Sequence, residues 1–257
     1  MQLLNIPALK DNYIWILVLP HRRAILIDPG DALPVLQCLQ TYRLTPMATL
    51  LTHHHADHTD GVRALKATYP SLAIYGPPET CRSGVTHPIH GPSTLTVCGV
   101  TVQVLAVPGH TLGHVAYYLS QGAPHNPWLF CGDTLFSAGC GRLFEGSAQQ
   151  LFQSLQQLVA LPANTQLCCA HEYTLENLRF ARVVDESNPF LPPYQQKIAS
   201  LRAQGLPSLP TSLHTQRLIN PFLRCHHPAL QQRLGFTQPP VSPSAVFAEL
   251  RRWKDQF

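Results

Sequence analysis

The chain has 257 residues, of which 45% are hydrophobic and 12% charged, and its formal net charge is +4. This composition is typical of a globular protein with a hydrophobic core, and the length is enough for one domain or one and a half. The opening MQLLNIPALKDNYIWILVLP is interrupted by Pro7 and Lys10, and no later run is long enough to span a bilayer. We therefore expect no signal peptide, no membrane partner and a cytoplasmic location.

Cysteine and histidine are the residues whose distribution is informative. The eight cysteines are scattered, with no C-x-x-C spacing, so we expect reduced thiols rather than disulfides. Cys131 and Cys140 lie near Asp133 in the sequence, but we expect them to be buried apolar residues and not nucleophiles. There are fourteen histidines, and seven of them lie at 53–58, at 110–114 or at position 171.

Short apolar runs, rich in residues that favour strands, end repeatedly in polar clusters. The runs lie at 24–28, 47–51, 102–107, 128–131 and 166–170. Because buried strands are apolar on both faces, these runs predict sheets covered by helices. The histidine cluster, His110, Asp133 and His171 each come just after one of these strands, where functional sites are commonly built.

Helical patterns separate the strands and dominate the last third of the chain. We expect helices at 61–68 and at 147–158. After His171 strand-like runs stop, and at 244–257 Val246, Leu250, Trp253 and Phe257 form an apolar stripe that should pack on the body of the protein. We therefore place an α/β catalytic domain at 1–173 and a smaller helical domain at 174–257.

The segment Thr52-His53-His54-His55-Ala56-Asp57-His58 places four imidazoles and a carboxylate within six positions. A single histidine is usually a core or surface residue, but a H-x-H-x-D-H cluster joined by three further strand-end ligands predicts a metal site. Six or seven nitrogen and oxygen donors exceed the roughly four that a tetrahedral zinc ion accepts, so we expect two ions. The donor chemistry suits zinc, iron or manganese and leaves the metal open.

Four segments in order, THHHADH, PGHTLGH, CGDTLF and AHEY, resemble the motifs of the metallo-β-lactamase superfamily. The resemblance implies an αββα sandwich with two divalent ions, for which we expect zinc, at the edge of its sheets. It implies three ligand sets: His53, His55 and His110 for one metal, Asp57, His58 and His171 for the other, and Asp133 as the bridge. His54 and His114 match positions that are not usually ligands, and we expect them to orient neighbours or to pack.

The substrate is indicated by other segments. GDTLFSAGCGRLFEG, HEYTLENLRFA, INPFLR and LRRWKDQF together are similar to the glyoxalase II family over essentially the whole chain. The resemblance implies hydrolysis of S-(2-hydroxyacyl)glutathione, chiefly S-D-lactoylglutathione, to D-lactate and glutathione in methylglyoxal detoxification. A hydroxide bridging the two metals would attack the thioester, with Asp57 and Asp133 as the catalytic carboxylates.

The same resemblance places Arg142, Tyr173, Arg251 and Lys254 at the glutathione site. From charge alone, a solvated helix face would be the better interpretation of the basic ending. One departure is Phe144. The resemblance implies that some members of the family carry tyrosine there, so we expect this chain to lack a hydroxyl contact to glutathione at that position.

Three alternatives have distinct signatures. A glutathione persulfide dioxygenase of the same superfamily uses one iron and does not need Asp57, His58 and His171. A tRNA-processing nuclease would carry a basic RNA-binding insertion, which is not visible. A structural metal protein would favour thiolate ligands. The sequence favours a dinuclear hydrolase acting as a monomer on a small thioester, with no nucleic-acid partner.

Overall fold

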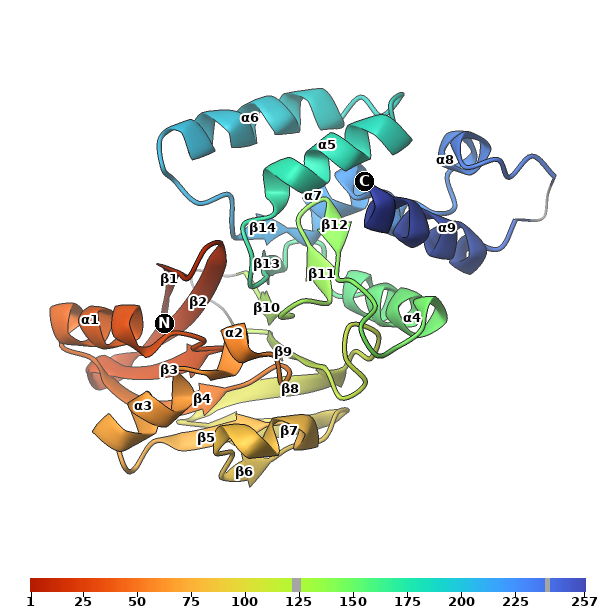
Figure 1. Cartoon of the computed structure of the whole chain (residues 1–257). Coiled ribbons are helices and arrows are strands. Elements are labelled where there is room, and N and C mark those ends of the chain that lie inside the picture. Colours follow the sequence, from red (N-terminus) through yellow and green to blue (C-terminus); the bar gives the residue numbers. More distant parts are fainter. Residues whose placement is uncertain (122–125, 239–240) are drawn as a thin grey trace. The chain divides into compact units, whose positions relative to one another are not determined.

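A computed structural model describes residues 1–121, 126–238 and 241–257 (Figure 1). The chain divides into two compact units, which are described separately. The first unit is Met1–Ala106 with Gly113–Gly132, and the second is Val107–Leu112 with Asp133–Phe257. Within the described residues, the helices are all too short or too polar to cross a membrane.

The first unit contains a six-stranded mixed sheet. Its strands, in sheet order, are β1 (Gln2–Ala8), β2 (Asn12–Leu19), β3 (Arg23–Ile27), β4 (Thr45–Leu50), β5 (Ala73–Gly76) and β6 (His87–Pro88). The pairs from β1 to β3 are antiparallel and those from β3 to β6 are parallel. The parallel pairs need crossover connections. These contain α1 (Ala32–Tyr42), α2 (Ala56–Thr59), α3 (Val62–Thr68) and the 3-10 helix η2 (Pro78–Ser83).

Alternation along the strands gives this sheet two buried faces. On β3, Ala24 and Leu26 join a core cluster with Val35 and Leu39 of α1. Residues at the positions in between point to the other face of the sheet, because side chains alternate along a strand. There the ring of Trp15 lies 6.4 Å from that of Phe130 in a second sheet.

The second sheet of the first unit is antiparallel. Its strands are β7 (Ser93–Val97), β8 (Val100–Ala106), β9 (Val115–Leu119) and β10 (Trp128–Phe130), paired in that order. The Tyr117 hydroxyl on β9 donates to the carbonyl of Leu51 at 2.6 Å, just after β4. The two sheets therefore pack face to face in this unit, and the polar segment that follows β4 is tied to the second sheet.

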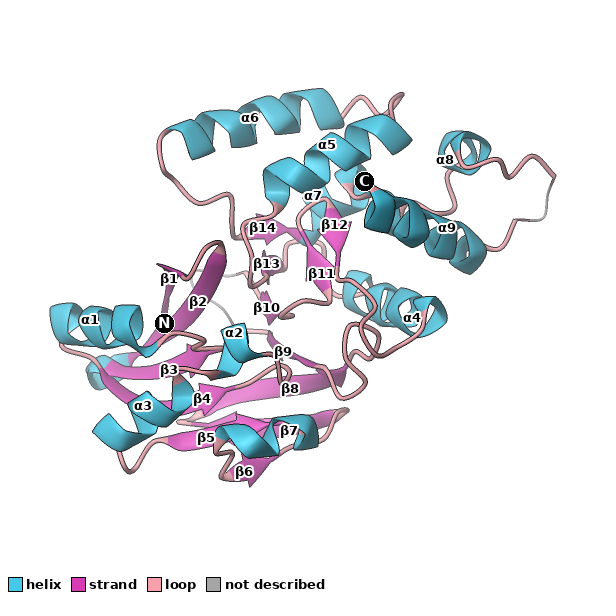
Figure 2. Cartoon of the chain, in the orientation of Figure 1, coloured by secondary structure: helices cyan, strands magenta, loops and turns pink. Residues whose placement is uncertain are grey.

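The second unit is mainly helical (Figure 2). Its strands form two short antiparallel pairs, β11 (Leu135–Phe136) with β12 (Gly139–Cys140), and β13 (Gln166–Cys168) with β14 (Thr211–Ser212). Its helices are α4 (Ala148–Val159), α5 (Thr174–Val184), α6 (Leu191–Ala203), α7 (Leu213–Ile219), η3 (Pro221–Leu223), α8 (Pro228–Arg233) and α9 (Pro243–Gln256). α4 begins with a capping box in which Ser147 and Gln150 satisfy each other's backbone N–H groups.

The expected helices at 61–68 and 147–158 are confirmed as α3 and α4. The expectation that strands stop after His171 is wrong for β14, a two-residue strand too short to show any periodic pattern. In the C-terminal stripe, Val246 and Leu250 are fully buried, whereas Phe257 is 57% exposed because it lies beyond the end of α9.

Candidate metal centre

The histidine cluster of the first unit begins where β4 ends and continues into α2. Thr52, His53 and His58 are buried, and His55 and Asp57 are half-buried. The Nε2 atom of His53 lies 3.1 Å from Nδ1 of His55. Nε2 of His58 lies 3.5 Å from a carboxylate oxygen of Asp57. Four candidate ligands therefore gather at one edge of the sheet in this unit.

Asp28, at the end of β3, holds this cluster and was not identified from the sequence. It is 4% exposed, and its backbone is left-handed, with φ 48°. Its carboxylate accepts from the N–H of Thr52 at 2.8 Å and from the Thr52 hydroxyl at 2.7 Å. Its second oxygen also lies 3.0 Å from Nδ1 of His58. Since a carboxylate at Nδ1 leaves Nε2 of that ring as the ligand atom, Asp28 orients His58 for metal binding.

Two further contacts fix the cluster. The Asn12 amide donates to the Asp57 carboxylate at 2.9 Å, and the Thr52 hydroxyl lies 3.0 Å from Nδ1 of His53. Gly30 allows the chain to approach closely, because a Cβ atom there would lie 1.7 Å from the carbonyl oxygen of Asp57. A larger residue at position 30 would therefore displace α2 and the ligands on it.

His54 and His114 have packing contacts. The His114 ring is 1% exposed, stacks on His53 at 4.5 Å, and has its Nδ1 atom 3.1 Å from the carbonyl of Val115. His54 is half-buried, with its ring edge-on to that of His55 at 4.8 Å. The expected roles of His54 and His114 in packing and orientation stay predictions.

In the second unit, His110 and His171 both lie beside Asp133. Nε2 of His110 is 3.5 Å from one carboxylate oxygen, and Nε2 of His171 is 3.3 Å from the other. Nδ1 of His110 is 2.8 Å from the carbonyl of Arg142, which can only accept a hydrogen bond. Nδ1 therefore carries the proton, and the Nε2 lone pair points to the Asp133 side. Gly141 is required here, since a Cβ atom would lie 2.0 Å from the carbonyl oxygen of Asp133.

The His171 segment is held by a partly buried polar network. The Glu172 carboxylate accepts from the N–H of Ser208 at 2.8 Å and from its hydroxyl at 2.5 Å. The Ser208 hydroxyl also lies 2.6 Å from that of Thr174, and Arg202 lies 3.6 Å from the Glu172 carboxylate. The loop before β14 therefore fixes the backbone on both sides of Tyr173.

The spacing of the ligand atoms fits divalent ions. Two ligands bound to one tetrahedral zinc at about 2.0–2.2 Å are separated by about 3.4 Å. The neighbouring ligand atoms described above lie 3.1–3.5 Å apart. The donors are imidazole and carboxylate, and His53, His58 and His110 each have a hydrogen-bonding group at the ring nitrogen that faces away.

The residues expected at a glutathione site all belong to the second unit. Tyr173 stacks on His171 with ring centroids 4.6 Å apart. Arg142 is exposed. Lys254 is half-buried, with Nζ 5.1 Å from the centre of the Phe180 ring. Burial, together with the positive charges of Arg251 and Arg142, lowers the pKa of Lys254.

Arg251 differs from Arg142 and Lys254 because it is only 3% exposed. Its guanidinium donates to the carbonyls of Cys140 and Gly141 at 3.1 and 3.3 Å and pairs with Asp255 at 2.8 Å. It therefore holds the loop that leads into Arg142.

Cys140 and Cys131 are both buried, as expected. Burial raises the pKa of the Cys140 thiol to about 11, so the thiol stays protonated at neutral pH. Phe144 is 63% exposed and lies edge-on to His110, with ring centroids 5.2 Å apart.

Comparisons with known proteins cover the whole chain. A family model described as the metallo-beta-lactamase superfamily matches residues 11–171, and one described as the hydroxyacylglutathione hydrolase C-terminus matches 172–257. The chain is 52% identical to a hydroxyacylglutathione hydrolase of Serratia proteamaculans and 51% identical to one of Edwardsiella ictaluri, in each case over all of both proteins.

Solved structures share the fold. The BLEG-1 B3 metallo-beta-lactamase has a TM-score of 0.65 and 25% identity, with 86% of this chain and 99% of that chain covered. TTHA1623 in a di-iron-bound form has a TM-score of 0.61 and 26% identity, with 85% of this chain and 98% of that chain covered. The metallo-β-lactamase fold expected from the sequence is confirmed, and the helical C-terminal region matches its own family.

Proposed function

The chain belongs to the hydroxyacylglutathione hydrolase family of the metallo-β-lactamase superfamily and is a hydrolase, and we propose that it cleaves S-(2-hydroxyacyl)glutathione, chiefly S-D-lactoylglutathione. The products would be D-lactate and glutathione, as in methylglyoxal detoxification. The observation that carries this proposal is the full-length identity of about half with hydrolases of that name, which includes the C-terminal region.

The proposed cofactors are two divalent ions, with zinc as the first choice. The ligands would be His53, His55 and His110 for one ion, Asp57, His58 and His171 for the other, and Asp133 for both. The superfamily match from 11 to 171 contains all seven positions. Ions bound there supply Lewis acidity and lower the pKa of a bound water from about 15.7 to about 7.

Neighbouring side chains and a backbone carbonyl orient the proposed metal ligands. In the proposal, Asp57 and Asp133 are the catalytic carboxylates, and Asn12 holds the Asp57 carboxylate in place. Asp28 and the carbonyl of Arg142 fix which nitrogen His58 and His110 present. Because each ring is fixed before substrate arrives, little reorganisation is needed during the reaction.

Glutathione has two carboxylates that require cationic partners. We assign these contacts to Arg142 and Lys254, with Tyr173 beside them. Arg251 belongs to the same site through the Cys140–Gly141 backbone that it holds. We also propose the domain boundary expected from the sequence, with a catalytic domain at 1–173 and a glutathione-binding helical domain at 174–257. Arg142 and Tyr173 would then contribute to the glutathione site from the catalytic domain.

The remaining expectations concern the cellular compartment, the oligomeric state and the binding partners. The eight cysteines are all free thiols in the described residues, which supports a reducing compartment such as the cytoplasm. We propose a monomer whose partner is the small thioester, with no membrane or nucleic-acid partner.

The proposal is tested by following thioester absorbance and free thiol release with S-D-lactoylglutathione and protein of measured metal content. We expect rapid turnover with two ions per chain. Asp133→Ala should lower kcat by more than about 10³-fold, since it removes a ligand of both ions. Two bound ions without turnover would contradict the substrate assignment and leave the family assignment intact.

A further inference from the structure

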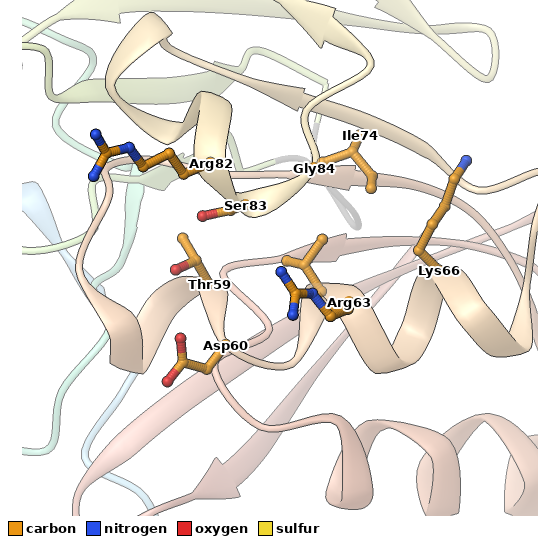
Figure 3. Close-up of a pocket in the computed structure, with 9 residues that line it drawn as sticks. Thr59, Asp60, Arg63, Lys66, Ile74, Arg82, Ser83 and Gly84 are labelled. Carbon is orange, nitrogen blue, oxygen red and sulfur yellow. The ribbon is translucent and has the colours of Figure 1, made fainter.

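A cavity of about 440 Å³ lies in the first unit, apart from every residue assigned to the metals or to glutathione. Its wall includes Thr59 and Asp60 after the histidine cluster, Arg63 and Lys66 of α3, and Arg82 and Ser83 of η2 (Figure 3). Its volume is within the range of about 300–1,000 Å³ found for small-molecule sites.

The cavity is electropositive. Three cationic side chains and one carboxylate line it, which leaves two net positive charges. In the part of the chain that the structure describes, the guanidinium groups of Arg63 and Arg82 have no carboxylate at ion-pair distance. Lys66 donates one hydrogen bond, to the carbonyl of Leu72 at 2.6 Å, and its ammonium has two further protons. Cationic groups are therefore available to an outside anion.

The cations are spread across the cavity. In Figure 3 Arg82 lies at the left, Arg63 near the middle and Lys66 at the right, with the Ser83 hydroxyl between the two arginines. A single small anion could contact only some of these cationic groups. Guanidinium groups bind carboxylates and phosphates through paired N–H donors, so a ligand with two separated anionic groups matches the wall best.

We propose that this cavity binds a small organic polyanion with two or more carboxylate or phosphate groups. The site is separate from the proposed glutathione site, because Arg142, Tyr173, Arg251 and Lys254 do not line it. It adjoins the ligand segment, since the Thr59 hydroxyl donates to the carbonyl of His55 at 3.1 Å.

The test is calorimetric titration of the full-length, metal-loaded protein with fructose 1,6-bisphosphate as the phosphate probe and adipate as the carboxylate probe. Arg63→Gln and Arg82→Gln should each weaken binding of the active probe about tenfold, because each removes a charge-assisted contact. Arg43→Gln is the matched control. It removes an equal charge from an exposed position of the same unit, outside the cavity, and should change the affinity less than twofold.

Metal content and hydrolysis of the thioester without added probe should be the same in all three variants, which shows that each is folded and loaded. Binding of either probe that depends on Arg63 and Arg82 supports the proposal and identifies the preferred anionic group. Failure of both probes to bind at millimolar concentration overturns it. An equal loss in Arg43→Gln also overturns it, since binding would then reflect general surface charge.

Discussion

In the first unit the four candidate ligands lie within 53–58, whereas in the second unit His110, Asp133 and His171 follow three different segments of the chain. The first group is held by side chains, with Asp28, Asn12 and Thr52 each bonded to a ligand or its neighbour. In the second group His110 is held by a backbone carbonyl, and the chain after His171 by a network around Glu172. A local motif therefore depends on a few polar side chains, and a dispersed group depends on loops.

Among the substitutions that test this comparison, the largest effect is expected at Asp28. Asp28→Ala removes the acceptor of Thr52 and the partner of His58, so metal affinity should fall about 10–100-fold. The measurement is competition with a chelator of known affinity. Asp31→Asn, which preserves an N-cap side chain on α1, is the control and should bind metal normally. Equal affinity in the two variants would show that Asp28 does not orient the ligands.

Substrate binding, which we place in the second unit, gives the next largest effect. Lys254→Ala should raise KM for the thioester about tenfold at unchanged kcat, because the lost interaction is equally strong before and during the reaction. Lys254→Arg keeps the charge and should recover most of the affinity. A fall in kcat at constant KM would assign Lys254 a role in the chemical step instead.

The network around Glu172 tests whether loops support the second group. Glu172→Gln weakens charge-assisted hydrogen bonds to Ser208 and the ion pair with Arg202, so the free energy of unfolding should fall by about 1–2 kcal/mol. Denaturant titration measures this change. Glu186→Gln, at an exposed position of the same unit, should leave the stability as it is. Similar losses of unfolding free energy in both variants would show that the network has no special role in stability.

The smallest effect is expected at Cys140. Its pKa is raised from 9.0 to about 11, so the folded thiol is neutral throughout the range in which an unfolded thiol begins to ionise. Cys140→Ala should therefore change kcat less than about twofold between pH 7 and 9, measured by thioester hydrolysis. Above pH 9 ionisation favours the unfolded chain, so stability should fall less steeply in the variant than in the unmodified protein. A large loss of kcat would indicate a thiol in the chemistry.

The same contrast explains what could be predicted from the sequence. Asp57 and His58 can be predicted as ligands because their motif is contiguous in the sequence. The strands before the ligands can be predicted because they are apolar runs. Asp28 was missed because it stands alone after a strand and meets its partners only in three dimensions. Burial of Arg251 could not be read from a basic ending, since the carbonyls that accept its hydrogen bonds lie near residue 140.

Gly30 and Gly141 carry no chemistry, yet each lies against the backbone of a candidate ligand, Asp57 in one case and Asp133 in the other. In a library of random substitutions, these two positions should tolerate as little variation as the ligands themselves. Fewer positions around the metals are therefore free to change toward other substrates than the ligand set suggests. The exposed side chain of Phe144 can vary more, because its ring only borders His110, and the Phe144 N–H that donates to the His110 carbonyl is kept by any residue except proline.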